Sequence, residues 1–453
     1  MNKKFSIVLV LLMLVSAILT ACQAQTPEVV TVTQIVAGTP IVVTATPAPT
    51  EDVSMAPIAL RFTVWTGNEK HLAMLNEIAT VYTALHPNVT VKYDTISFDD
   101  YVAKVTVQLA GGTPPDAGWL METAAPSFIE AGVLADLKPS LDAFADYNFA
   151  DLSKPSLSLW ESGTALYGVP FSNSPIFVAY NADLFKAAGI ATPNEMITAG
   201  SWTWENLATA SKTITEKGPA GSYGFVGFDA AMFNTQPFST LIPAIWAYGG
   251  NSWSSDGKTC MINQPEAVQA VQMFHDMTFK DKSIVPPGDK TAFAGGTVGM
   301  TLVQLSRLTQ LKDAGFKFGI APLPAGPKGN KAVIGQAAIV VFDKSPNKAV
   351  AEDFVAFMTT KDGFSKMAQF FPPTRLSVLD SGILATNNPD LDPAQVQAAV
   401  SDSIKNGTVL PSHVNFAKID LAMRAQFDTL WTADAKVQDV LNAACADSAA
   451  YFK

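Results

Sequence analysis

Aromatic, amide and carboxylate side chains gather in two short stretches of the sequence, each directly after a run of apolar residues. The first stretch supplies Trp65, Asn68 and Glu69, and the second supplies Trp119 and Glu122. An aromatic ring packs well against the C–H face of a hydroxyl-rich molecule, while amides and carboxylates hydrogen-bond its hydroxyl groups. These residue types in one cleft would bind a small polar solute without reacting with it.

Motifs for other kinds of chemistry are missing from the sequence. Gly257-Lys258-Thr259 lacks the glycine that a phosphate-binding loop needs five positions earlier, where Ser252 stands. No two of the four histidines form an HxH or HxxxH pair, and no CxxC or GxSxG motif occurs. We therefore predict no metal, no cofactor and no catalytic residue.

The two polar stretches fall within a regular succession of predicted strands and helices. Residues 60–64 alternate between apolar and polar or small side chains, as a strand does, and residues 72–85 place apolar side chains at steps of three and four, as an amphipathic helix does. A second strand over 89–93 and a helix over 101–110 follow. This order predicts an α/β fold with parallel strands, whose ligands bind beyond the carboxyl ends of the strands.

Length and composition narrow the class of protein. The chain has 453 residues, of which 48% are hydrophobic and 15% charged, with a net charge of −10. That length allows two or three domains, and so few charges exclude a disordered chain. The acidic balance disfavours a nucleic-acid binder, which needs clustered Lys and Arg. The mean hydropathy of +0.20 raises the question of a membrane protein.

The N-terminal residues predict an export signal, which accounts for part of the apolar character without a membrane-spanning segment in the mature protein. Lys3 and Lys4 precede a short uncharged apolar run, which is typical of a signal peptide. The sequence Leu19-Thr20-Ala21-Cys22 resembles the lipobox of bacterial lipoproteins, where the signal is cut before the cysteine and the thiol receives diacylglycerol. We expect residues 1–21 to be removed and Cys22 to be lipidated, with an ordinary signal peptide as the alternative.

Residues 22–57 are expected to form an extended tether. They are rich in Thr and Val, and their five prolines prevent a continuous helix. Part of this Val-rich segment pairing as a strand is the alternative. The other cysteines, Cys260 and Cys445, lie far apart in the sequence, and we expect two separately buried thiols, although an oxidising compartment would permit a bond.

From about residue 58 to the C-terminus the order of motifs resembles that of bacterial extracellular solute-binding proteins of family 1, the maltose-binding-like sugar-binding proteins of ABC transporters. The motifs are NVTV (88–91), FDDY (98–101), AGGTPPD (110–116), AGVLADL (131–137), ALYGVPF (165–171), YNADLFKAAGI (180–190), TWENL (203–207), FAGGTVGM (293–300), APLPAGP (321–327) and PPTR (372–375).

The resemblance implies a two-lobed, type II periplasmic-binding-protein-like fold with a ligand cleft between lobes joined by hinge segments. The N-lobe would comprise residues 58–170 with 327–371, and the C-lobe residues 171–326 with 372–453. Three crossovers between the lobes would form the hinge.

The resemblance also implies further ligand contacts, in addition to the five residues of the two polar stretches. These are Asn173, Ser174, Phe238, Gln304, Ser306 and Arg375. Trp119, Phe238 and Arg375 are the foremost candidates. Leu120 and Ser306 stand where maltose-binding relatives carry tryptophans, which argues against a maltodextrin as the ligand.

Some of these motifs have a structural interpretation as well. Tyr180-Asn181 is expected to end a strand and cap the next helix, and Thr203 to cap a helix that buries Trp204. Core packing is the alternative role for Trp65 and Trp246.

The function that the resemblance implies is solute capture without catalysis. A lipid-anchored monomer on the extracytoplasmic face of the cytoplasmic membrane would bind a mono- or oligosaccharide and deliver it to an ABC permease, with no nucleic-acid partner. The alternatives are the same fold with a peptide, polyamine or polyol phosphate as solute, and an anchored extracellular glycoside hydrolase.

Overall fold

A computed structural model describes residues 56–228, 237–311 and 314–452, without the side chains at 237, 238 and 309. The expected signal peptide, Cys22 and nearly all of the tether lie outside the described residues. Residues Pro57–Lys453 form one compact unit. Within the described ranges, no helix combines the length and the apolar character needed to cross a membrane.

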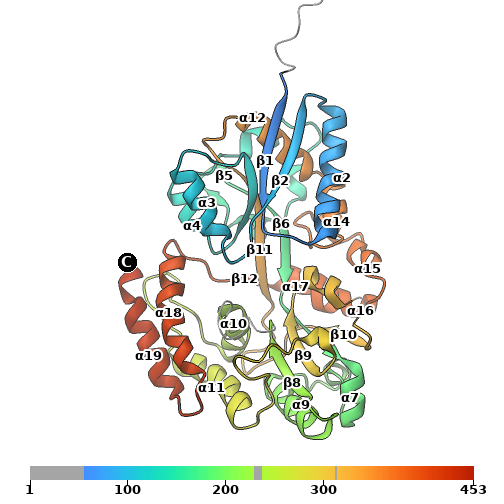
Figure 1. The fold of residues 1–453 in the computed structure, drawn as a ribbon, viewed down its shortest axis with the longest axis vertical. Coiled ribbons are helices and arrows are strands. Elements are labelled where there is room, and N and C mark those ends of the chain that lie inside the picture. Colours follow the sequence, from blue (N-terminus) through green and yellow to red (C-terminus); the bar gives the residue numbers. More distant parts are fainter. Residues whose placement is uncertain (1–55, 229–236, 312–313, 453) are drawn as a thin grey trace, which may run out of the picture. The chain divides into compact units, whose positions relative to one another are not determined.

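The first of two main sheets has six strands, drawn in the upper part of the body in Figure 1. Its strands are β1 (Ile58–Val64), β2 (Val89–Thr95), β3 (Ala117–Met121), β6 (Val169–Pro175), β11 (Val333–Val341) and β12 (Thr408–Val409). β1 lies parallel to both β2 and β3, and β11 runs antiparallel to β3 and β6. The predicted parallel start of an α/β fold is confirmed.

The local elements of this sheet follow from side-chain periodicity. Leu60, Phe62 and Val64 of β1 are buried, as their alternation predicts. α2 (Glu69–Leu85) buries one face, and His86, next to Pro87, is its C-cap. α3 occupies Tyr101–Ala110, the range that the sequence predicts.

The second sheet has the strand order β10-β7-β9-β8 and lies in the lower part of Figure 1. Its strands are β7 (Phe177–Asn181), β8 (Tyr223–Gly227), β9 (Val298–Val303) and β10 (Phe318–Ala321). Helices α7 (Ala182–Ala188), α9 (Trp204–Lys217), α10 (Pro237–Tyr248) and α11 (Pro265–Phe279) belong to this region. The chain passes between the sheets at Ile176, between β6 and β7, and again between β10 and β11.

The remaining elements are mostly short helices. They include α4 (Ala125–Glu130), α5 (Lys138–Ala143), α6 (Lys154–Leu157), β4 (Glu161–Ser162), β5 (Ala165–Leu166), α8 (Pro193–Thr198), η5 (Leu305–Leu311), α12 (Lys348–Met358), α13 (Lys361–Met367), α14 (Leu376–Leu379), α15 (Ile383–Asn387), α16 (Pro393–Val396), α17 (Asp402–Asn406), α18 (Phe416–Leu430) and α19 (Val437–Ser448).

Two predicted helix caps are confirmed. The Asn181 side chain accepts hydrogen bonds from the backbone N–H groups of Asp183 and Leu184 at the start of α7. The Thr203 hydroxyl accepts from the Asn206 N–H at the start of α9, and Trp204 is fully buried. These side chains satisfy donors that a helix leaves unpaired at its first turn.

The expectation of two separate thiols is wrong, because Cys260 and Cys445 form a disulfide with their Cα atoms 5.4 Å apart. Cys445 lies on α19, which packs against α18 and α11. Cys260 forms a β-bridge with Trp253 in the loop before α11. Helix packing brings the two cysteines together across 185 positions, and sequence spacing carries no record of such tertiary proximity.

Candidate functional site

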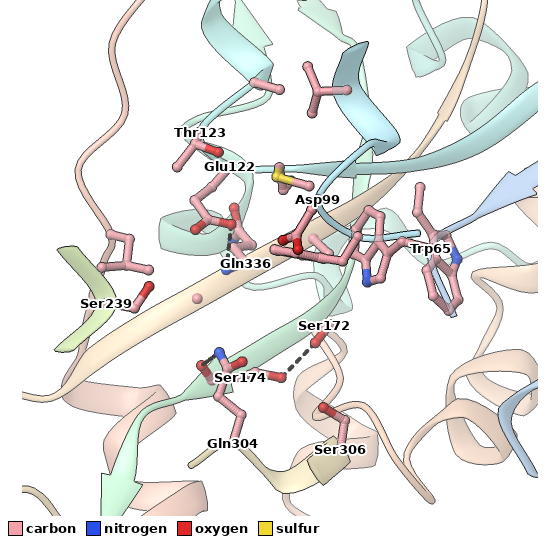
Figure 2. Close-up of a pocket in the computed structure, with 18 of the residues that line it drawn as sticks. Trp65, Asp99, Glu122, Thr123, Ser172, Ser174, Ser239, Gln304, Ser306 and Gln336 are labelled. Atoms are coloured by element: carbon pink, nitrogen blue, oxygen red, sulfur yellow. Dashed lines mark hydrogen bonds between the residues drawn. The ribbon is translucent and has the colours of Figure 1, made fainter. Parts of the chain in front are cut away.

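A cavity of about 1370 Å³ is lined by residues of the first sheet, by residues that follow β8 and β9 of the second sheet, and by neighbouring helices. On the first sheet, its walls come from the residues that follow β1, β2 and β3, which is where parallel strands place their ligands. On the other side they come from η5 and from α18. Figure 2 shows Glu122 and Thr123 on one side of this cleft and Gln304 and Ser306 on the other.

Seven of the eleven predicted ligand contacts line the cleft. They are Trp65, Asn68, Trp119, Glu122, Ser174, Gln304 and Ser306. They come from four separate stretches of the sequence, and the fold gathers them around one cavity. Contact with a solute stays a prediction for each of them.

Asn173 lies behind the cleft wall. Successive residues of a strand face opposite sides, so Ser172 and Ser174 of β6 line the cleft and share a 2.7 Å hydrogen bond (Figure 2), while Asn173 faces away. Its amide donates to the Ser156 hydroxyl at 3.0 Å and accepts from the Gln336 amide at 2.8 Å. Asn173 therefore holds β6 in place.

Glu69 and Phe238 also do not appear among the residues lining the cleft. Glu69 is exposed in the first turn of α2. Phe238 belongs to α10, but its side chain lies outside the described residues.

Arg375 serves the fold instead of the cleft. Its side chain is 1% exposed and donates hydrogen bonds to the backbone carbonyls of Thr359 (2.7 Å), Tyr147 (2.6 Å) and Asn148 (3.1 Å). Its guanidinium also lies over the Tyr147 ring, 4.6 Å from the ring centre. The guanidinium N–H groups that the prediction assigned to a solute are therefore used in hydrogen bonds within the fold.

The aromatic residues of the cleft divide into buried and accessible rings. Trp119 is 1% exposed because it stacks on Phe171 at 4.7 Å and meets the edge of Trp65 at 5.1 Å. A ring covered in this way offers no open face to a solute. Four lining rings keep accessible surface: Trp65, Phe98, Trp253 and Phe416.

The sequence did not predict Phe98, Trp253 or Phe416 as site residues. Phe98 carried a usable signal, since it follows the second predicted strand at the carboxyl edge of the sheet. Trp253 lies in the loop before Cys260, and Phe416 begins α18, against which the helix of Cys445 packs; no local pattern marks either residue.

Glu122 is a carboxyl group with an unusual environment. Its Oε2 accepts the backbone N–H of Gln336 at 3.1 Å, a hydrogen bond that Figure 2 shows. Burial raises the pKa of Glu122 to about 7, and the hydrogen bond from Gln336 opposes this shift only in part. Near neutral pH the group can therefore either donate or accept a hydrogen bond.

The opposite wall carries two arginines. Arg307 and Arg424 both line the cleft, and Arg424 pairs with Asp420 at 2.7 Å on the same face of α18. Burial raises the pKa of Asp420, and the Arg424 charge acts against that rise. Among the described residues, no group of three or more His, Cys, Asp or Glu side chains is placed to hold a metal ion.

The fold occurs in solved structures of solute-binding proteins. An ABC substrate-binding protein from Listeria monocytogenes in complex with cycloalternan aligns with a TM-score of 0.76 and 23% identity, covering 87% of this chain and 99% of that one. UgpB from Mycobacterium tuberculosis in complex with glycerophosphocholine gives a TM-score of 0.73 and 20% identity, covering 86% and 96%. The predicted two-lobed type II fold is confirmed.

Sequence comparison also finds solute-binding proteins. The arabinooligosaccharide-binding protein of Bacillus subtilis is 23% identical, covering 72% of this chain and 76% of its own length. The family of bacterial extracellular solute-binding proteins matches residues 68–363. Its members are extracytoplasmic substrate-binding proteins of ABC transporters and not enzymes. This chain, with its cleft between two sheets, belongs to the bacterial extracellular solute-binding protein family.

Proposed function

We propose that this protein is the lipid-anchored substrate-binding component of an ABC importer, and that it captures a carbohydrate in the cleft without chemical conversion. The observation that carries this proposal is the make-up of the cleft, where accessible aromatic rings stand beside amide and hydroxyl groups. The rings are Trp65, Phe98, Trp253 and Phe416, and the neutral polar groups are Asn68, Ser172, Ser174, Gln304 and Ser306. Stacking rings and neutral hydrogen-bonding groups suit a mono- or oligosaccharide.

Capture proceeds by closure of two lobes, predicted as 58–170 with 327–371 and 171–326 with 372–453. Because β6 stays in the first sheet as far as Pro175, the first crossing between the lobes falls at Ile176. Support comes from the two sheets, which share a cavity and are joined by few chain passages. A solute that contacts both walls shifts the population toward the closed form. The permease then receives the closed, loaded form.

Anchoring through Cys22 is a separate part of the proposal, and a simple variant tests it. Wild-type cells should retain the protein in the membrane fraction, and Cys22→Ala cells should release it or leave its signal peptide uncleaved. Metabolic labelling with a radioactive fatty acid should mark the wild type alone. A Cys22→Ala protein that still carries label would refute the anchor.

A thermal-shift screen with mono- and oligosaccharides tests the choice of solute. A ligand that binds only the folded state raises the melting temperature, by an amount that grows with concentration above Kd. Each positive sugar is then incubated with the protein and examined for products. Binding without turnover supports capture, whereas a hydrolysed product would make the protein a glycoside hydrolase.

A polyol phosphate is the second candidate solute, favoured by one observation. Arg307 and Arg424 line the cleft, and guanidinium groups bind phosphate through paired hydrogen bonds. The structural neighbour with glycerophosphocholine shows that this fold holds such a solute. The thermal-shift screen distinguishes a polyol phosphate from a carbohydrate as the solute, if glycerophosphodiesters are included beside neutral sugars.

A further inference from the structure

Among the described residues that line the cleft, three buried side-chain nitrogen atoms have no hydrogen-bond partner, and two of the three, unlike Nε of Arg424, belong to rings. These two ring atoms are Nε1 of Trp119 and Nε2 of His71, on side chains that are 1% and 7% exposed. Both residues line the cleft. Both rings also contact Phe371, with ring centres 5.5 Å away for Trp119 and 5.0 Å away for His71. A buried polar group without a partner is destabilising, so such groups call for an explanation.

The hydrogen bonds around Thr66 indicate which nitrogen of His71 carries the proton. The Thr66 hydroxyl is buried, accepts the Asn68 N–H at 3.1 Å, and lies 3.0 Å from Nδ1 of His71. Of the two possible tautomers, we assign the one in which the hydroxyl uses its single proton to donate to Nδ1. His71 therefore carries its proton on Nε2, and Nε2 is a donor like the indole N–H of Trp119.

Burial also keeps this histidine uncharged. It lowers the pKa of His71 to about 4, so the ring is neutral at all pH values well above 4. A neutral Nε2–H attracts a hydroxyl or ether oxygen without drawing in an anion by charge.

We propose that His71 and Trp119 are a pair of donors in the cleft, each of which binds an acceptor oxygen of the solute, and that this pair selects against solutes presenting only N–H donors there. The proposal rests on the proposed function and narrows its solute class. Sugar hydroxyl or ring oxygens accept from the two donors, whereas a polyamine ammonium would leave both donors unpaired. Exclusion by an unpaired buried group is far stronger than exclusion by size.

The first experiment compares His71→Phe with a matched variant of another buried histidine, His275→Phe. His275 also has an unpartnered ring nitrogen, but it does not line the cleft. With a sugar that binds the wild type, His71→Phe should weaken binding at least tenfold by calorimetry, and His275→Phe should not. A deoxy analogue that lacks the recognised hydroxyl should bind His71→Phe and wild type alike. If His71→Phe folds and binds the sugar as wild type does, the donor pair is refuted while sugar capture stands.

A second experiment needs no ligand and no variant. The 15N shifts of the His71 ring in the full-length protein should show the proton on Nε2. A proton on Nδ1 would overturn the proposal whether or not any sugar binds. If the wild type binds no carbohydrate and Nε2 nevertheless carries the proton, the proposed solute class fails and the donor assignment stands.

Discussion

The Arg375 guanidinium is fully buried and donates hydrogen bonds to three backbone carbonyls from two distant segments. Replacing it by methionine keeps much of the volume but removes the donors to those carbonyls and the ionic partner of Asp151, which keeps its hydrogen bonds from Ser377. We expect Arg375→Met to lower the free energy of unfolding by about 3–5 kcal/mol, measured by urea denaturation. Arg61→Met is the control, because the half-exposed pair of Arg61 with Asp94 contributes less than about 1 kcal/mol. A stable Arg375→Met protein with lost affinity would return Arg375 to the binding site.

Glu122 makes stability depend on pH in a defined direction. Its pKa rises on folding from 4.5 to about 7, so between these values the folded protein holds a proton that the unfolded chain releases. The free energy of unfolding of the wild type therefore falls as the pH rises through this window, by up to about 3 kcal/mol from this group. Glu122→Gln removes the effect, so its stability relative to wild type should increase from pH 4.5 to 7 in denaturation at each pH.

Glu195 provides a control of opposite sign. Hydrogen bonds from the Thr192 backbone and hydroxyl lower the pKa of Glu195, so its contribution is present above the unfolded value and is lost as the pH falls. Glu195→Gln should therefore be most destabilised near neutral pH and least in acid. If the two variants showed the same trend with pH, burial could not be the cause of the Glu122 shift.

At the residue level, the sequence predicted side-chain type better than side-chain direction. Trp65, Glu122 and Ser174 were placed at the cleft because they follow predicted strands or family motifs, and strand ends fix position along the chain. Asn173 differs from Ser174 by one position, and only the pairing of β6 with β11 decides which of them faces the cleft. Arg375 depends in the same way on partners more than two hundred residues away.

At the level of elements, the disulfide supports two segments of the cleft wall, one directly and one through helix packing. The loop before Cys260 carries Trp253, and α19 with Cys445 packs on α18, which carries Phe416. We expect Cys260→Ala/Cys445→Ala to lower the free energy of unfolding by up to about 5 kcal/mol in the chain-entropy model of a loop this long. Solute affinity should fall too, because the loop that carries Trp253 loses its covalent link to α19, the helix that packs on α18.

Chemical reduction supplies the control for this prediction. Wild-type protein treated with a phosphine reductant should approach the stability and affinity of the double variant, and the reductant should not change the variant further. Unchanged affinity in a folded double variant would show that helix packing alone holds the wall.

The elements themselves were predicted well where periodicity and caps act locally. α2, α3 and the caps of α7 and α9 depend on residues within one or two turns, so their sequence signals are complete. β11 could not be located in this way, because it is buried along its whole length and joins three other strands. Such strands show a continuous apolar run without alternation.

At the scale of the whole molecule, the two walls of the cleft carry exposed apolar side chains that closure would cover. Phe98, next to α3, is 43% exposed and Leu421 on α18 is 73% exposed, and both line the cavity. If the lobes close over a solute, these side chains leave water, and their burial favours the closed form by roughly 25 cal/mol per Å² of apolar area. Closure thus depends on surface that the solute need not touch.

Leu421→Asn tests this dependence, with Val81→Asn as its match. Val81 is 45% exposed on α2 and does not line the cleft, so both changes replace an exposed aliphatic side chain on a helix. Each should alter the free energy of unfolding by about 0.5 kcal/mol or less. Only Leu421→Asn should weaken solute binding several-fold by calorimetry. It should also reduce the ligand-induced decrease in radius of gyration measured by X-ray scattering at a fixed, subsaturating solute concentration. A wild-type radius that does not change on saturation would contradict lobe closure, and equal affinities of the two variants would contradict the role of Leu421 in it.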